Sequence, residues 1–221
     1  MKKTKLLAPD LPDTLAPADA LTDELRDLLD DDDDIEAIRF EGATFESLGV
    51  RRASFRGCAF VRCVFTPDET TRYDFQDCVF QSCDFAGAQL LKASLLRVSL
   101  VSCRGVGMYL TDAVLRSVTL IDCQFAYANF GMAHLTLVEM TGCDLSHASF
   151  GEAQLKNVAW TRCRLSGAEL FGTRLTGVDL RTNEIDGIIL SDLRELAGAK
   201  VTPLQACELA RLLGIEVEAE G

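Results

Sequence analysis

A five-residue spacing of large apolar residues constrains the fold of this chain more than any other feature. From Phe40 to Leu190 every fifth residue can be followed through 31 positions, and only Thr70 and Gly105 among them are not large and apolar. An α-helix repeats about every 3.6 residues and a β-strand about every 2, so neither element alone explains a sustained period of five. The spacing predicts a square coil with a turn at every corner.

A second inward set of mostly small residues lies two places before each central residue, and its identities recur with every fourth unit of the repeat. Four units therefore make one coil. One column is cysteine from Cys63 to Cys163, another is valine from Val98 to Val178, and two are mostly alanine. Glycine is frequent two places after a central residue, where a tight turn favours a positive φ angle. These glycines are Gly42, Gly57, Gly87, Gly107, Gly142, Gly167, Gly172, Gly177 and Gly187.

Motifs such as Ala128-Asn129-Phe130, Cys143-Asp144-Leu145 and Ala168-Glu169-Leu170 resemble the A(D/N)Lxx signature of the pentapeptide repeat family. The resemblance covers residues 36–190, which are the greater part of the chain. It implies an all-β solenoid, a right-handed quadrilateral β-helix with the central residue and its i−2 neighbour inside. Residues 36–190 then predict about eight coils and a rod roughly 37 Å long.

The chain divides into three segments on this pattern. Residues 1–35 form an acidic leader outside the repeat, with a net charge of −7, a possible short helix over residues 21–29 and the carboxylate run Asp30–Asp34. Mutual repulsion favours a solvated spacer for that run over a metal or partner site. Residues 36–190 form the β-helix, and residues 191–221 form a C-terminal helix and short tail.

The C-terminal helix has clear start and stop signals. Thr202 is the expected N-cap, Pro203 the first helical residue, Gln205 the partner in a capping box and Gly214 the stop. The helix either caps the last coil or forms a homodimer. It is similar to the C-terminal helix of the quinolone-resistance and gyrase-inhibiting pentapeptide repeat proteins, which implies head-to-head dimerisation. The residues expected at that interface are Leu204, Cys207, Leu209, Leu212, Leu213 and Ile215.

Two interruptions of the repeat stand out. Residues 66–73 keep the numerical register but lose the apolar identities, which predicts a loop across residues 66–74. Its partner-contacting residues would be Asp68, Glu69 and Arg72, and a merely degenerate coil is the alternative. Gly105 predicts a thin place in the core.

Composition narrows the range of partners. A net charge of −12 argues against a basic nucleic-acid binder and against attraction to anionic lipid. The N-terminus has no apolar stretch behind its lysines, so we expect a cytoplasmic protein with reduced thiols, no direct contact with nucleic acid and no membrane segment.

Candidate chemistry is sparse. The two histidines, His134 and His147, occupy outward positions whose separation is not a whole number of coils, which places them on different faces. No CxxC pair occurs, and the cysteine column predicts inward, inert thiols. No phosphate-binding loop or nucleophile motif is found. The sequence therefore predicts no catalytic residue, no cofactor and no metal, and hence a protein that is not an enzyme.

Two functions remain open. The resemblance implies a non-catalytic DNA mimic that binds a type II topoisomerase, DNA gyrase, and modulates it or protects it from quinolones; the expected partner-facing acidic residues are Asp144, Asp179, Glu184, Asp186 and Asp192. Residues 36–190 have a net charge of only −2, where a duplex of that length carries roughly 22 negative charges. The chain also lacks a counterpart of the second, longer loop of the quinolone-resistance proteins. The alternative is a structural or adaptor module with another protein partner.

Overall fold

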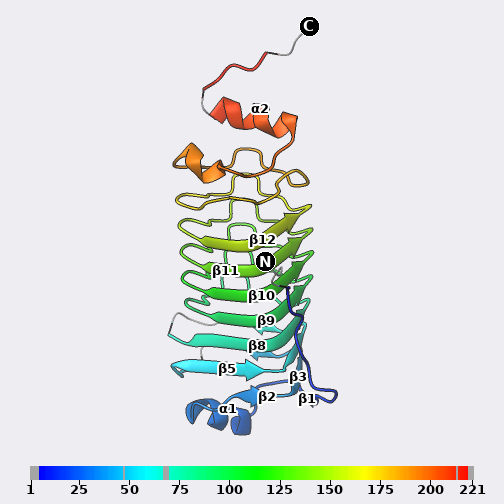
Figure 1. The fold of residues 1–221 in the computed structure, drawn as a ribbon. Helices are drawn as coiled ribbons and strands as arrows, with labels where there is room; N and C mark the ends of the chain where they lie inside the picture. The colour runs from blue at the N-terminus through cyan, green and yellow to red at the C-terminus, as the bar shows by residue number, and fades with distance from the viewer. Residues whose placement is uncertain (1–4, 47, 67–69, 213, 219–221) are drawn as a thin grey trace.

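The computed structural model describes residues 5–46, 48–66, 70–212 and 214–218. They form a right-handed β-solenoid of about seven turns with a short C-terminal helix (Figure 1). The predicted fold class is therefore confirmed, with slightly fewer turns than the eight expected. The N-terminal strands are β1 (Ala16–Ala18), β2 (Ile35–Glu36), β3 (Ile38–Glu41), β4 (Thr44–Phe45), β5 (Arg52–Arg56), β6 (Ala59–Val61) and β7 (Val64–Phe65). The longer strands are β8 (Arg72–Gln81), β9 (Ser94–Val101), β10 (Val114–Ile121), β11 (His134–Thr141) and β12 (Gln154–Thr161).

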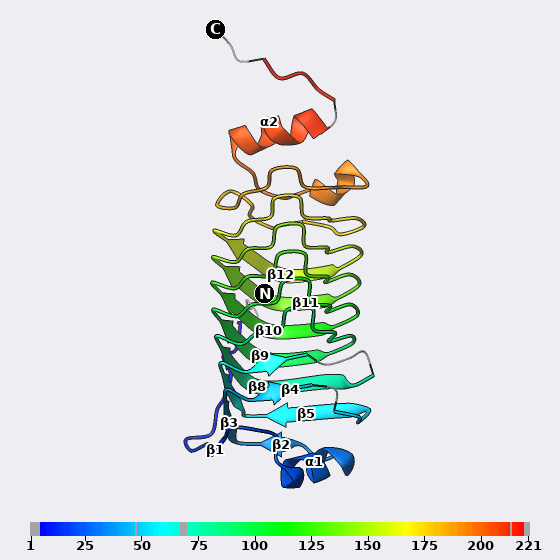
Figure 2. The same cartoon turned by 180° about the vertical axis from the view of Figure 1, so that it is seen from behind.

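The coil has four walls, which we name by their central residues. Wall A holds residues 45, 65 and so on to 185, wall B holds 50 to 190, wall C holds 55 to 175 and wall D holds 40 to 180, each in steps of 20. Strands β8 to β12 each cross walls C and D, whereas walls A and B are mostly turns joined by isolated bridges. Neighbouring long strands are parallel and pair residues at equivalent places of successive coils, as Val114 does with His134. Figure 2 shows the stacked coils from behind.

The corners have the backbone geometry that the glycines predict. All nine glycines named above have positive φ angles, between 58° and 81°. The same corner position also has positive φ where it holds a bulky residue, as at Arg62, Tyr127 and Leu137. An L-residue in this region costs roughly 1 kcal/mol, so the stacking of coils, rather than glycine alone, imposes the turn.

The central residues form the core, as the spacing predicts. They are buried from residue 40 to residue 190 except for Val50, Leu155 and Leu190, which are partly exposed, and Thr70, which is exposed. In the N-terminal coils the core is mostly phenylalanine, and rings in successive coils stack with centroids 4.6 Å apart in the Phe45–Phe65 and Phe60–Phe80 pairs.

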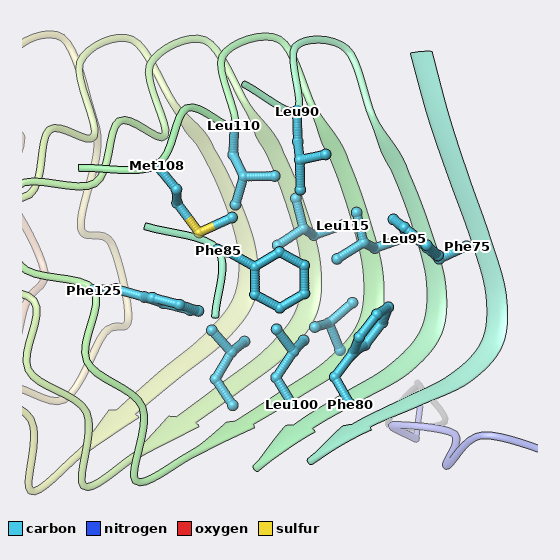
Figure 3. A pocket seen from close by; sticks show the side chains of 12 residues that line it. Phe75, Phe80, Phe85, Leu90, Leu95, Leu100, Met108, Leu110, Leu115 and Phe125 are labelled. Atoms are coloured by element: carbon cyan, nitrogen blue, oxygen red, sulfur yellow. The ribbon is translucent and has the colours of Figure 1, made fainter. Parts of the chain in front are cut away.

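The gap in core packing that was expected at Gly105 is largely filled by neighbouring side chains. A Cβ atom added to Gly105 would lie 2.2 Å from the Phe125 ring and 2.5 Å from the Met108 sulfur. Both side chains point into the interior, where an apolar cavity of about 20 Å³ remains (Figure 3). Larger side chains in the adjacent positions therefore compensate for the missing one.

The leader packs against the rod along part of its length. Strand β1 pairs in parallel with β3, Ala16 lying opposite Ile38. Further toward the N-terminus, Pro12 lies against the corner at Gly57, where an added Cβ would approach its ring to 2.9 Å. The backbone N–H of Asp10 donates a 3.1 Å hydrogen bond to Asp77.

Helix α1 (Asp23–Asp30) lies at the N-terminal end of the rod (Figure 1). Thr22 is its N-cap, and Leu21 and Leu29 are buried with the core of the first coil. Part of the carboxylate run expected to be a solvated spacer is bound to the rod instead, because Asp34 forms a 2.7 Å ion pair with Arg56 of β5.

The C-terminal end is closed by two short helices. The 3₁₀-helix η1 (Leu193–Leu196) begins at a capping box formed by Asp192 and Glu195. Helix α2 (Pro203–Leu212) follows. The predicted capping box is confirmed, since the Thr202 N–H donates to the Gln205 side chain at 2.9 Å and the Gln205 N–H donates to the Thr202 hydroxyl at 3.2 Å. Gly214 has a φ angle of 72°, as expected of a helix stop.

Candidate interaction surface

Helix α2 lies across the last coil and holds it mainly through hydrogen bonds. The buried Gln205 amide donates to the carbonyl oxygens of Leu180 at 2.9 Å and Asn183 at 2.8 Å. Leu209 packs against the solenoid core, so its side chain is partly used in the cap rather than free for a partner.

Helix α2 and the segment that follows it leave large apolar side chains in solvent. Leu204 is 71% exposed, Leu212 49% and Ile215 52%. Cys207 is half-buried, and Leu213 lies outside the described residues. Three of the residues expected at a dimer interface are therefore available to a partner.

A groove continues this apolar surface onto the rod. Its volume is about 440 Å³, and Leu212 of α2 lies at one side of it. Ile189 and Leu193, 42% and 46% exposed, line the other side. Contiguous exposed apolar surface of this kind marks interaction sites in soluble proteins, and it makes the C-terminal end the strongest candidate for binding.

The acidic residues expected to face a partner are mostly paired with arginine. Arg164 lies between Asp144 and Glu184 on wall A, 3.7 Å and 3.0 Å from their carboxylates. Arg104 pairs in the same way with Asp84 of the preceding coil at 3.0 Å. Wall A therefore presents alternating charges rather than a negative stripe.

Two more of the predicted acidic residues, Asp179 and Asp192, are also in ion pairs. Asp179 is bound by Arg181 at 2.6 Å, and Asp192 by Arg194 at 2.5 Å. Hydrogen bonds from these arginine side chains and backbones lower the pKa of each carboxyl to about 2. Among the five predicted acidic residues, all within the described part of the chain, only Asp186 has no ion pair.

The structure narrows the loop expected at residues 66–74. Asp68 and Glu69 lie outside the described residues. Arg72 begins strand β8, where it lies opposite Arg52 and contacts Asp74 at 3.2 Å, so the expected loop does not extend to residues 72–74. The coil regains its register there because residues 72–76 pair with residues 52–56 of the preceding coil.

The histidines have the outward positions predicted for them. His134 is exposed at the start of β11 on wall C, and His147 is exposed at the corner between walls A and B. The His147 ring stacks on Tyr127 with centroids 4.9 Å apart and lies over Gly167, where an added Cβ would approach it to 2.4 Å.

Six of the nine cysteines form the predicted inward column, and all nine are free thiols. Eight of the nine are buried, and only Cys207 is partly exposed. Each buried thiol contacts the carbonyl oxygen of a residue in the preceding coil, as Cys163 does with Met140 at 3.3 Å. The hydrogen bond with the thiol of the preceding coil, together with burial, raises the pKa of Cys123 and of Cys143 to about 12. Such thiols are poor nucleophiles, whereas the hydrogen bond with Cys83 lowers the pKa of Cys63, at the start of the column, to about 7.

We also searched the described residues for a metal-binding group and for a membrane-spanning helix. None of the described His, Cys, Asp and Glu residues form a group of three or more arranged to hold a metal ion. No helix in the described part of the chain is long and apolar enough to cross a membrane.

Comparison with solved structures finds similar chains. A trypsin-treated form of QnrB1, described as a plasmid-mediated fluoroquinolone resistance protein, is 25% identical with a TM-score of 0.39, covering 85% of this chain and 92% of that one. HetL of Nostoc sp. strain PCC 7120, a pentapeptide repeat protein involved in heterocyst differentiation regulation, is 19% identical with a TM-score of 0.33, covering 76% and 86%.

No curated protein matches the sequence significantly. The model of the pentapeptide repeat region matches residues 73–140 and 115–190, which together make up more than half of the chain. The matched region contains all of β8 except its first residue, strands β9 to β12 and the turns that follow them up to residue 190. The chain belongs to the pentapeptide repeat family.

Proposed function

We propose that this protein is a non-catalytic interaction module that forms a homodimer through its C-terminal end and binds a further protein along its rod. The observation that carries the proposal is the exposure of the apolar side chains of Leu204, Leu212 and Ile215, of which Leu212 also lines the groove beside Ile189 and Leu193. Closed dimers use one patch twice, and a terminal helix with an unburied apolar side supplies such a patch.

The dimer is tested by measuring the molar mass of the full chain by light scattering. Wild-type protein is expected to have twice the mass of the 24.2 kDa chain. The variant Leu204→Glu/Leu212→Glu is expected to be monomeric at the same concentration, with unchanged far-UV circular dichroism because neither side chain is part of the core. Tyr109→Glu is a control on wall B, where a 44% exposed side chain lies away from α2. A monomeric wild-type protein would refute the dimer.

A narrower form of the proposal names the partner as a type II topoisomerase, DNA gyrase, with the protein occupying the place of DNA. The ion pairs of Arg164, Arg181 and Arg194 weigh against this form, because these three arginines contact four of the five carboxylates expected to imitate phosphates and offset most of their charge. The adaptor function makes no demand on charge, and we favour it.

A supercoiling assay separates the two forms. The adaptor function predicts that gyrase activity is unchanged by the protein up to high micromolar concentration. Inhibition at low micromolar concentration would establish the gyrase partner instead. In that case Asp186→Asn, which removes the unpaired carboxylate of the set, should weaken inhibition, and Asp144→Asn should weaken it less.

A further inference from the structure

The hydrogen-bonded ladder of the rod is interrupted on two walls after β12. Strands β8 to β12 each pair with the preceding strand across walls C and D, and β12 is the last in this order. In the described residues 153–162 and 173–182, no backbone-to-backbone hydrogen bond joins the two coils. The edge of β12 therefore has N–H and C=O groups that lack the partners available to the preceding strands.

Side chains take the place of the missing backbone bonds at both ends of this interruption. The Thr173 hydroxyl donates to the Phe150 carbonyl of the preceding coil, and the Ala153 carbonyl lies 3.3 Å from the same hydroxyl. At the other end, the Asn183 amide donates to the Trp160 carbonyl at 2.9 Å and accepts from the Cys163 N–H at 2.9 Å. A side chain that bridges two backbones spans more distance than a direct bond, so it holds the coils apart.

The sequence supplies the cause of this change. Thr173 occupies the column that holds alanine at residues 93, 113, 133 and 153, and Asn183 occupies the column that holds cysteine from residue 63 to residue 163. Both side chains are buried, Thr173 at 0% and Asn183 at 6% exposed, and both are polar where the preceding coils are not. The break therefore begins where the repeat departs from its own inward pattern.

An open cleft marks the break on the outside of the rod. Its volume is about 230 Å³, and it is lined by Val158, Trp160, Gly177 and Asp179 among others. The strand next to it is more exposed than its equivalent one coil earlier. Leu135 is fully buried in β11, whereas Leu155 in β12 is partly exposed.

The other two walls remain continuous across the same level. On wall A, the Leu165 N–H donates to Glu184 at 2.7 Å, and on wall B, the Leu170 N–H donates to Ile189 at 2.9 Å. Beyond the break, residues 175–180 are bonded to the closing segment, as Gly177 is to Gly198 at 3.0 Å. The C-terminal coils and their cap thus form a unit attached to the rod by two walls of four.

We propose that this break is a mechanical joint: walls A and B act as the hinge, the unbonded coils on walls C and D separate and approach at the cleft on wall D, and the C-terminal unit of residues 173–212 tilts relative to the rod. A solenoid resists bending through the hydrogen bonds and the core contacts between its coils. Between β12 and the next coil, the backbone hydrogen bonds are missing on two of the four walls. The joint rests on the hydrogen bonds alone and does not depend on the proposed dimer or partner.

Hydrogen exchange of the full chain tests the opening of the cleft. Amides of β12 (residues 154–161) are expected to exchange on the order of tenfold faster than those of β11 (residues 134–141), which occupy the same place one coil earlier. Equal protection of the two strands in the wild-type protein would overturn the proposal.

A repaired variant tests the cause. Thr173→Ala/Asn183→Cys restores the residues of the preceding coil in both columns and is expected to bring the exchange of β12 close to that of β11. Thr136→Ala, on the outward side of β11, is the control and should leave both strands unchanged. If the repaired variant folds and its β12 amides still exchange at the wild-type rate, the two side chains do not hold the joint open.

Spin-label distances test the tilting itself, independently of the repaired variant. In a Cys207→Ser background, labels at residues 121 and 181 span the break on wall D, and labels at residues 101 and 161 span the same number of coils without it. The joint predicts a clearly broader distance distribution for the first pair. Equal widths would show a rod that is rigid throughout.

Discussion

The two ends of the rod are closed in different ways. At the N-terminal end, α1 buries Leu21 and Leu29 in the first coil, and the phenylalanine stacks begin directly beneath it. At the C-terminal end, α2 is held by the hydrogen bonds of Gln205, while Leu204 and Leu212 stay in solvent. A terminal helix that buries its apolar residues against the rod has few of them left to contact a partner. A terminal helix held by the hydrogen bonds of an amide side chain leaves more of them exposed.

The same contrast extends into the adjoining coils. The N-terminal coils are joined by strands on walls C and D and by stacked rings within, whereas the last coils have turns and isolated bridges and are separated from β12 by a cleft. We therefore expect the N-terminal half to account for most of the stability and the C-terminal part to hold the adaptable surface.

The largest expected difference between the two regions is in the free energy of unfolding that is lost when a core side chain is shortened. Phe60→Ala removes a ring that stacks on Phe80 and should lower the free energy of unfolding by about 3–5 kcal/mol. Leu155→Ala, beside the cleft, should lower it by about 1–2 kcal/mol because that side chain is partly exposed. Urea unfolding followed by far-UV circular dichroism measures both. Equal losses would remove the distinction between the two regions.

The caps should respond unequally to the loss of one polar side chain. Gln205→Ala leaves the carbonyls of Leu180 and Asn183 without their donor and should cost about 2 kcal/mol. Thr22→Ala at the N-terminal cap removes a long 3.4 Å bond to Leu25 and should cost no more than about 1 kcal/mol, since Leu29 still anchors the helix. Thermal unfolding of the two variants gives the comparison, and a larger effect of Thr22→Ala would reverse it.

Asp77 of β8, which bonds to Arg97 and to the leader, makes a smaller and pH-dependent contribution to stability. Burial alone would raise the pKa of Asp77, but the hydrogen bonds from Arg97 and from the Asp10 N–H outweigh it, and the pKa is lowered. The stability that the Asp77 carboxylate contributes is therefore fully present above about pH 4, the pKa of this group in the unfolded chain. It is lost as the pH falls through the lower pKa of the folded state.

The variant Asp77→Asn isolates this contribution. It should be about 1–2 kcal/mol less stable than wild type at pH 7, and the difference should shrink as the pH is lowered below 4. Unfolding curves across this pH range measure it. A difference that stays constant with pH would show that the charge of Asp77 plays no part.

The smallest expected effect is on the reactivity of the cysteine thiols rather than on the stability of the protein. In the native protein only Cys207, on the C-terminal helix, is partly exposed, whereas the eight other cysteines are buried. A thiol reagent should therefore modify one cysteine per native chain and all nine in denaturant. Rapid native labelling within the Cys63–Cys163 column would mean that the coils open more readily than their packing indicates.

The repeat made most of the fold predictable because one rule applies to every coil. Centres at every fifth residue, glycine at the corners and the start and stop of α2 were all readable from residue types at fixed spacing. The ion pairs on wall A were open to the same logic, since Asp84 and Arg104, or Asp144 and Arg164, are separated by one full coil in sequence and so lie on adjacent coils.

Features that depend on contacts outside the period were not predictable. No spacing rule connects Pro12 with Gly57 or Asp10 with Asp77, so the packing of the leader could be found only in three dimensions. The break after β12 had a signal, the polar residues Thr173 and Asn183 in apolar columns, but that signal does not reveal which walls separate. The candidate surface was predicted in part, because helix periodicity does not decide that Leu209 packs inward while Leu204 does not.

The thiol contacts give the solenoid a direction. Each inward donor reaches back to a carbonyl of the coil before it, from Cys58 to Ile35 at one end to Asn183 and Trp160 near the other. For these inward contacts, a truncated rod would have unsatisfied carbonyl acceptors at its C-terminal face and unsatisfied side-chain donors at its N-terminal face, whereas the backbone bonds between coils run in both directions. Any replacement cap, or any fusion of two such rods, has to bring donors to the inward carbonyls of the first face and acceptors to the inward donors of the second. Gln205 already meets the first requirement.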